Sequence, residues 1–397
     1  MDVLTKPTRP VDAAPASLNP ARYLAIWAAT LATLLIVNIA LCVFADPYAI
    51  LGTPPIAGLT ARKPAAAAWP RLSKPTLVAR VQPTTLIIGS STADIGFDPD
   101  SPAWPPTARP VFNFGIDGAL PETQLRFLQH ALAVSHPTRI IIAANFVDSV
   151  SDHAPPATED FDARLRARAD GSPNPGYARG RLADLVFATL SFTATLDSLS
   201  TVFSQHNPDA TIQTAAGWNT GAVFRRWVRQ DGAFALFLNK DREKIPQFRG
   251  WTHTMFVQTE QTIAMVRAAR AHGAQVTLLI LPNHTDEMEA LHQLGLDQAA
   301  QAWKTALFAA LPDTTIWDFS GATPYTTESL PAPSDRTTQL RWFWEPIHFK
   351  RELGDLMIAR IFGAPGDFGV RGQAETGLAA WETAHPNDLK RITGLTK

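Results

Sequence analysis

An uncharged apolar run near the N-terminus is the feature that most limits what this chain can fold into. From Tyr23 to Ala45 the sequence reads YLAIWAATLATLLIVNIALCVFA, 23 residues without a charge, with Asn38 as the strongest polar interruption. At about 1.5 Å of rise per residue, a helix of this length reaches roughly 35 Å and crosses a hydrocarbon core of about 30 Å. The sequence therefore predicts one transmembrane helix over residues 23–45.

A cleaved signal peptide is the alternative, since Val43 and Ala45 fit the small-residue pattern that precedes a cleavage site. The apolar stretch of such a peptide is only about 7–15 residues long, so the longer run favours an uncleaved anchor. Cys42 follows the bulky Leu41, which argues against a lipoprotein signal, and we expect it to face lipid or to pack. As the single cysteine, it allows no intramolecular disulfide and no cysteine-based metal site.

Basic residues beside the apolar run predict its orientation. Lys6, Arg9 and Arg22 precede it, and the first basic residue after it is Arg62. By the positive-inside rule, the tail of residues 1–22 stays in the cytoplasm and the rest of the chain is exported. In a bacterium this predicts a single-pass protein of the inner membrane with its main domain in the periplasm.

Composition limits the class of the exported part. Hydrophobic residues make up 46% of the 397 residues and charged residues 18%, which is typical of a folded chain. The net charge of −1 provides no field that would attract nucleic acid, so we expect no nucleic-acid partner. Residues 46–80 are rich in Pro and Ala and predict a semi-rigid spacer. Residues 81–363 are expected to form the main domain, and residues 364–397 a loose helical tail.

Short apolar runs alternate with helical patterns through the main domain. The patterns predict strands at 84–89, 111–114, 139–144, 275–281 and 314–319, and helices at 122–134, 251–272, 286–311 and 351–362. This alternation favours an α/β fold, a three-layer α/β/α sandwich of the flavodoxin-like kind with a mostly parallel sheet. Residues 151–250 lack strand signals and predict a largely helical insertion over one rim of the sheet.

Two short motifs carry groups suited to nucleophilic chemistry. The segment GSST, residues 89–92, directly follows the first predicted strand, where ligand-facing loops of a parallel sheet emerge. The segment EPIH places Glu345 three residues before His348. The carboxylate can orient the imidazole and leave its other nitrogen free to accept a proton from a serine. We find no metal-ligand cluster and no phosphate-binding glycine loop in the sequence, so no cofactor is expected.

Together these motifs resemble the SGNH or GDSL hydrolase superfamily, in particular its membrane-anchored, exported bacterial members. The resemblance covers roughly residues 81–150 and 251–363. It implies a three-layer sandwich and an esterase, lipase, carbohydrate deacetylase or O-acyltransferase activity. It also implies that Ser91 is the nucleophile, His348 the base and Glu345 the supporting acid.

The resemblance further implies two donors for a substrate oxyanion. These are the backbone N–H of Gly118, in the segment NFGIDG, and the side-chain amide of Asn145 after the third strand. The chain departs from the family pattern at Ser90, where the family has Asp, and at Phe146, where an Asp is also usual. These departures keep open a second hypothesis, a non-catalytic protein with this fold that binds or scaffolds in envelope polysaccharide assembly.

Several further residues have two interpretations. His284 and Asp318 follow predicted strands at the same rim, so each could contact substrate or serve as a loop or capping residue. Trp344 could stack on a sugar ring beside His348 or pack in the core. Asp148 could assist Asn145 or cap the insertion. Five arginines, Arg164, Arg166, Arg168, Arg179 and Arg181, could hold an anionic polymer or line a solvated helix face.

The sequence thus predicts a membrane-anchored periplasmic serine esterase or O-acyltransferase. Its expected substrates are acyl esters, acetyl above all, on envelope or extracellular polysaccharide. The expected contacts are the inner membrane, through residues 23–45, and the acylated polymer. The acyl group, the acceptor and the oligomeric state stay open.

Overall fold

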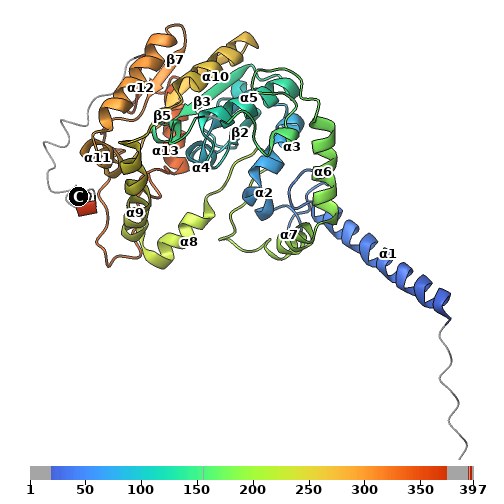
Figure 1. Ribbon diagram of the computed structural model, residues 1–397. Helices are drawn as coiled ribbons and strands as arrows, with labels where there is room; N and C mark the ends of the chain where they lie inside the picture. Colours follow the sequence, from blue (N-terminus) through green and yellow to red (C-terminus); the bar gives the residue numbers. More distant parts are fainter. Residues whose placement is uncertain (1–18, 155, 373–391, 393, 396–397) are drawn as a thin grey trace, which may run out of the picture.

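A six-stranded sheet forms the centre of the molecule (Figure 1). The computed structural model describes residues 19–154, 156–372, 392 and 394–395. The strand order is β2 (Val111–Gly115), β1 (Thr85–Gly89), β3 (Arg139–Ala144), β6 (Gln275–Ile280), β7 (Thr315–Asp318) and β8 (Val370–Arg371). The first five strands are parallel to their neighbours, and β8 pairs antiparallel with β7. The fold is therefore mixed α/β with a mostly parallel sheet, as the sequence predicts.

The helices connect these strands and form the insertion. They are α1 (Pro20–Ala45), α2 (Pro64–Ala68), α3 (Pro70–Val81), α4 (Ser91–Gly96), α5 (Pro121–Val134), α6 (Tyr177–Leu190), α7 (Phe192–Phe203), α8 (Ala222–Asp231), α9 (Ala233–Trp251), α10 (Thr259–Ala271), α11 (Thr285–Gln293), α12 (Asp297–Ala310) and α13 (Arg351–Ile361). Helix α1 is long and apolar enough to cross a membrane, and it extends away from the rest of the protein (Figure 1).

Side chains of the central strands point alternately into two separate hydrophobic clusters. Leu86 and Ile88 of β1 pack in a cluster with residues from α3, α5, α10 and α12. Ile87, between them, packs with residues from α4 and α13. All three side chains are fully buried. The continuous apolar run that predicts β1 is explained by a strand that is covered on both sides.

Two predicted helices prove to be interrupted. The pattern over 251–272 contains the end of α9, a short strand β5 (Phe256–Val257) that pairs with β4 (Val150–Ser151), and then α10. The pattern over 286–311 is divided into α11 and α12 at Gly295, whose φ of +72° suits a glycine and ends the first helix. In the predicted helical tail, the described residues include β8, while 373–391, 393 and 396–397 lie outside the described residues.

The spacer predicted for residues 46–80 is wrong, because this segment folds into the domain. Pro64 and Pro70 stand at the start of α2 and α3, where the missing backbone N–H costs nothing. Leu77 and Val78 of α3 are buried in the same cluster as Leu86. A Pro/Ala-rich composition therefore marks helix starts and close packing here, and not a linker.

A buried ion pair ties this segment to the carboxyl edge of the sheet. Lys74 of α3 places its Nζ 2.6 Å from Oδ1 of Asp94 in α4 and donates to the backbone oxygen of Gly115, also at 2.6 Å. The side chains of Lys74 and Asp94 are 0% and 3% exposed. Burial lowers the pKa of Lys74 and raises that of Asp94, and their mutual attraction opposes both changes. Removing either partner would leave the other charge buried alone.

The insertion of residues 151–250 is largely helical, as predicted, but it does not simply cover one rim. Its first helices, α6 and α7, pack against α1, at the edge of the domain from which that helix extends (Figure 1). Its last helices, α8 and α9, contribute Phe224 and Phe237 to one core cluster and Phe248 to the other. The insertion is therefore part of the folded core and cannot be removed as a separate lid.

The buried pair gives a stability prediction. Replacing Lys74 with Met leaves the Asp94 carboxylate without its cation, so we expect a loss of about 3–5 kcal/mol of unfolding free energy. Adding Asp94→Asn removes the unpaired charge and should restore part of this loss. Urea denaturation of the full-length protein in detergent micelles, followed by tryptophan fluorescence, measures both. Equal stabilities of the Lys74→Met variant and the wild type would show that the pair does not hold this segment.

Candidate active site

Ser91 stands where β1 turns into α4. Strand β1 ends at Gly89, and a Cβ there would lie 2.6 Å from the Cβ of Ala93, so only glycine permits this tight turn. Ser90 caps the helix by accepting the backbone N–H of Thr92 at 3.4 Å. The first helical residue is Ser91, which is half-buried. The turn thus places a serine hydroxyl at the carboxyl edge of the sheet.

Ser91 and His348 lie within hydrogen-bond distance although 257 residues separate them. The Oγ of Ser91 is 2.8 Å from Nε2 of His348, and Nδ1 of His348 is bonded to Oε1 of Glu345. An ionised carboxylate can only accept, so Nδ1 carries the ring hydrogen and Nε2 accepts from the serine. The structure therefore brings together the three residues that the sequence assigns as nucleophile, base and supporting acid.

The carboxylate of Glu345 is held by the turn that it begins. It is buried and accepts the backbone N–H of Ile347 at 3.1 Å and of His348 at 3.2 Å. Burial alone raises its pKa, but the charges of His348 and Lys240 and these hydrogen bonds leave the pKa below its ordinary value. Glu345 is consequently ionised at neutral pH and can stabilise a protonated imidazole.

The buried side-chain amide of Asn113 joins strand β2 to α4, the helix that begins with Ser91. Asn113 donates through Nδ2 to the backbone oxygens of Ala93 at 2.8 Å and Phe97 at 2.7 Å, and its Oδ1 accepts from Gly115 at 2.8 Å. Gly118, the expected oxyanion donor, lies in the loop after β2 with a left-handed φ of +64° and is exposed. Because β2 and β1 are parallel neighbours, this loop lies at the same sheet edge as Ser91.

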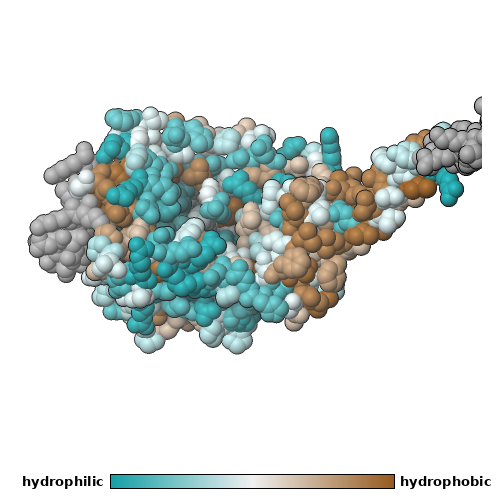
Figure 2. Space-filling view, turned by 90° about the horizontal axis from the view of Figure 1, so that it is seen from below, coloured by the Kyte–Doolittle hydropathy of each residue, from teal (hydrophilic) through white to brown (hydrophobic). Residues whose placement is uncertain are grey.

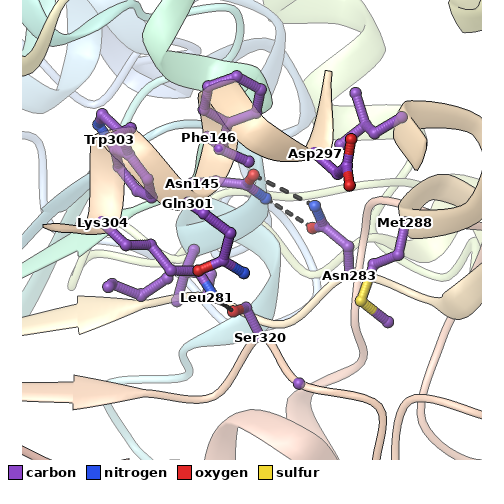
Figure 3. A pocket seen from close by; sticks show the side chains of 14 residues that line it. Asn145, Phe146, Leu281, Asn283, Met288, Asp297, Gln301, Trp303, Lys304 and Ser320 are labelled. Carbon is purple, nitrogen blue, oxygen red and sulfur yellow. Dashed lines mark hydrogen bonds between the residues drawn. The ribbon is translucent and has the colours of Figure 1, made fainter. Parts of the chain in front are cut away.

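Asn145 is part of a buried amide pair (Figure 3). Its Nδ2 donates to Oδ1 of Asn283 at 2.6 Å, and Nδ2 of Asn283 donates back at 3.2 Å. The two residues follow β3 and β6, which are neighbours in the sheet, and they line a cavity of about 90 Å³ with Trp303 and Lys304. The bond to Asn283 uses one of the two hydrogens on Asn145 Nδ2. Its role as an oxyanion donor stays a prediction.

The sequence patterns did not predict that Asn283 is the hydrogen-bond partner of Asn145. Asn283 stands beyond the predicted strand 275–281, as Asn145 stands beyond 139–144. Polar residues after adjacent parallel strands meet at one edge, which is the signal that could have found the pair.

Asp148 is hydrogen-bonded to the serine that precedes Ser91. Its Oδ2 accepts a hydrogen bond from Oγ of Ser90 at 2.5 Å. Burial raises the pKa of this carboxyl, while the bond from Ser90 and the nearby His348 oppose that change. Ser90 therefore points toward a partly buried acid, whereas its neighbour Ser91 points toward the imidazole.

Three candidate substrate contacts prove to have structural roles. His284 is buried and caps α11: its Nδ1 accepts from the backbone N–H of Asp286 at 3.2 Å, and its Nε2 is 2.8 Å from the oxygen of Glu328. Asp318 is buried and lies 3.0 Å from Nζ of Lys304. The third candidate, Trp344, packs against the aromatic ring of Phe224.

Trp344 is 8% exposed and stacks on Phe224 of α8 with ring centroids 5.8 Å apart. The Phe224 ring also lies 5.5 Å from that of His348. Trp344 therefore supports a wall beside the imidazole, and its aromatic face is covered by packing.

Three of the five arginines of residues 164–181 have contacts within the protein. Arg164 pairs with Asp184 at 2.7 Å, and Arg181 donates to Oγ1 of Thr76 at 2.7 Å. The guanidinium of Arg166 lies over the ring of Tyr177. Arg164 and Arg181 thus connect α6 to its surroundings, whereas Arg166, Arg168 and Arg179 are exposed.

Compared with protein-family models and with curated protein sequences, the chain matches none. Among the residues that the structure describes, no group of three or more His, Cys, Asp or Glu side chains is placed to hold a metal ion. The hydrogen-bonded contact of Ser91 with His348, and of His348 with Glu345, is therefore the feature of the chain that points to a function.

Besides Glu345, a second buried carboxyl group lies near Ser91 and His348. Glu287 of α11 accepts from Nδ2 of Asn283 at 2.6 Å and is 2% exposed. Burial raises its pKa well above the ordinary value, and the carboxyl groups of Asp148 and Glu345 raise it further. The folded protein therefore retains a proton on Glu287 that the unfolded chain releases above about pH 4.5.

This difference predicts how stability depends on pH. As the pH rises above the unfolded value, the unfolded chain loses its proton first, so the wild type becomes less stable. Glu287→Gln keeps the acceptor for Asn283 without this cost, and at pH 8 it should be more stable than the wild type by at least about 1 kcal/mol. Near pH 4 the two should converge. Urea titrations in detergent micelles at both pH values test this, and parallel pH profiles would contradict it.

Proposed function

We propose that the protein is a membrane-anchored serine esterase or O-acyltransferase with an SGNH-like three-layer sandwich. The observation that carries the proposal is the continuous hydrogen-bond chain from Ser91 through His348 to Glu345. Ser91 is half-buried, and the His348 side chain is 13% exposed, so a substrate can reach both. Serine, histidine and carboxylate in this order are the groups that acyl transfer requires.

The first half of the reaction transfers the acyl group to the protein. Oγ of Ser91 attacks the ester carbonyl carbon while Nε2 of His348 takes its proton, and Glu345 stabilises the resulting imidazolium. The carbonyl oxygen becomes an oxyanion, for which Gly118 N–H and the second hydrogen of Asn145 Nδ2 are the proposed donors. The tetrahedral centre then expels the alcohol oxygen, which receives the proton from His348.

The second half returns the serine to its free form. A water molecule or a sugar hydroxyl attacks the acyl carbon, and His348 removes its proton. The bond to Oγ of Ser91 breaks, and the proton returns to Ser91. Attack by water makes the protein an esterase, and attack by a sugar hydroxyl makes it an O-acyltransferase.

The substrate class follows from the proposed location. Helix α1 can cross a membrane, and the basic residues before it favour a cytoplasmic N-terminus and an exported domain. In a bacterium this would be an inner-membrane protein facing the periplasm. The acylated polymers within reach there are envelope or extracellular polysaccharides, so we infer acetyl esters of such sugars as substrates.

The competing candidate is a non-catalytic protein of the same fold. It is favoured by the bond between Asn145 and Asn283, which occupies part of a proposed oxyanion donor. The two candidates differ in one respect: only a catalytic serine would react with a serine-directed fluorophosphonate.

The nucleophile can be tested with two neighbouring serines. The full-length protein in detergent should be labelled by a fluorophosphonate, and Ser91→Ala should abolish both labelling and acetyl-ester hydrolysis. Turnover should fall by at least about 1,000-fold in Ser91→Ala and in His348→Ala, and the double variant should be little worse, because the two residues act as a unit.

Ser90→Ala is the matched control, since Ser90 is adjacent but is bonded to Asp148 and not to the imidazole. It should keep its labelling. Labelling that survives in Ser91→Ala, or that is lost only in Ser90→Ala, would show that Ser91 is not the nucleophile. A folded wild type that is neither labelled nor active would support the non-catalytic candidate.

The proposed orientation has its own test. A reporter enzyme that is active only in the periplasm, fused after Lys397, should be active, because a single crossing with a basic N-terminal flank exports the C-terminus. A cytoplasmic reporter fused at the same position should be inactive. The opposite pattern would overturn the location and, with it, the polysaccharide substrates.

A further inference from the structure

The helices α6 and α7 carry apolar side chains on their outer surface. Leu182, Phe192 and Phe203 are 63%, 76% and 81% exposed. Further exposed apolar residues on the two helices are Leu185, Val186, Leu190, Leu196 and Leu199. Figure 2 shows hydrophobic surface gathered where α1 meets the domain and continuing along α1. A helix pair in water would present the opposite arrangement.

The two charged residues that follow Arg181 in this helix pair are directed inward. Between residues 182 and 203 the only charged side chains are Asp184 and Asp197. Asp184 is buried and pairs with Arg164 at 2.7 Å, and Asp197 accepts from the hydroxyl of Tyr48 at 2.7 Å. From residue 182 to residue 203 the pair therefore directs its charges toward the protein and exposes its apolar side chains, as expected of a surface in contact with lipid. The two arginines of α6, Arg179 and Arg181, stand in its first turns.

The pair contacts α1 within the helix, before its C-terminal end at Ala45. Nδ2 of Asn38 donates to the backbone oxygen of Thr189 at 3.1 Å, and Oγ1 of Thr195 donates to Oδ1 of Asn38 at 2.6 Å. Asn38 stands seven residues before Ala45, where α1 ends, which is about 10 Å along the helix axis. If α1 crosses a bilayer, the junction of α6 and α7 lies at the depth of the acyl chains.

Three aromatic side chains lie closer to the domain than Asn38 does. Tyr48, Trp69 and Phe187 pack together just beyond the end of α1, with ring centroids between 5.5 and 6.3 Å apart. Tyrosine and tryptophan are enriched at the boundary between lipid and water. Their position relative to Asn38 places that boundary above the junction of α6 and α7.

We propose that α6 and α7 form a re-entrant hairpin that inserts into the same membrane as α1, on the side of the catalytic domain. The helices have 14 and 12 residues, and the chain bends by 62° between them. At about 1.5 Å per residue, neither helix can cross a hydrocarbon core of about 30 Å alone. The partner of their apolar surface is lipid acyl chains. The proposal depends on α1 spanning the membrane and is independent of the reaction at Ser91.

The hairpin sets the position of the active site over the membrane. The chain leaves α7 and reaches Phe224, the residue that packs beside the His348 ring. Through Arg181 and Thr76 the hairpin also holds α3, which carries Lys74. The domain would therefore rest on the bilayer in a fixed orientation, in contrast to a domain raised on a flexible spacer.

Depth-dependent fluorescence quenching tests the proposal on the full-length protein in phosphatidylcholine liposomes. Single cysteines replace Phe192, Leu196, Leu34 or Glu260 in a Cys42→Ala background, and each carries an environment-sensitive NBD dye. Leu34, an exposed residue of α1, reports the span, and Glu260, an exposed residue of α10, is the matched control in the domain. We expect nitroxide on the acyl chains to quench positions 34, 192 and 196 at least twofold and to spare position 260.

The other outcomes would overturn the proposal. If iodide in the water quenches positions 192 and 196 as strongly as 260, the hairpin faces solvent. If neither iodide nor the lipid nitroxide reaches them, another protein or a second copy covers the surface. If position 34 escapes the lipid nitroxide as well, α1 does not lie in the bilayer and the hairpin has no membrane to enter. None of these outcomes bears on fluorophosphonate labelling of Ser91, so the two proposals fail separately.

Discussion

The buried contact among Lys74, Asp94 and Gly115 is the interaction on which the arrangement of the site depends. One ammonium group joins α3 to the helix that carries Ser91 and to the end of β2. Removing the charges of Lys74 and Asp94 from water costs free energy, so the arrangement is stable only when both charges and the Gly115 oxygen are present. The helix that carries Ser91, the loop of Gly118 and the segment that follows α1 are therefore fixed relative to one another by a single cluster.

Two buried glutamates near the site show how the surroundings decide what a carboxyl group can do. Glu345 is ionised, because burial is outweighed by His348, Lys240 and backbone donors, and this suits it to support an imidazolium. For Glu287, burial raises the pKa and the neighbouring acids raise it further, so it holds a proton while it accepts from Asn283. The same residue type thus provides a charge in one place and a neutral hydrogen-bonding group in the other.

Local sequence patterns predicted the parallel strands well, because runs such as Leu86 to Ile88 are apolar on both faces of the sheet. The meeting of Ser91 with His348 could be anticipated only from the order of the two motifs. The folding of residues 46–80 could not be anticipated from composition, because Lys74 reads as an ordinary surface residue until its partner Asp94 is placed beside it. The amide pair of Asn145 and Asn283 likewise depends on strand order, which periodicity does not provide.

The proposed reaction requires Ser91 to carry the acyl group during turnover. The most direct measurement is mass spectrometry of peptides from the full-length protein, quenched with acid during reaction with an activated acetyl ester. If the serine is the nucleophile, the peptide that contains Ser91 carries one acetyl group, assigned to Ser91 by fragmentation, and this group is lost in His348→Ala. Continued hydrolysis without an acetylated Ser91, or an acetyl group on Ser90, would contradict this role of Ser91.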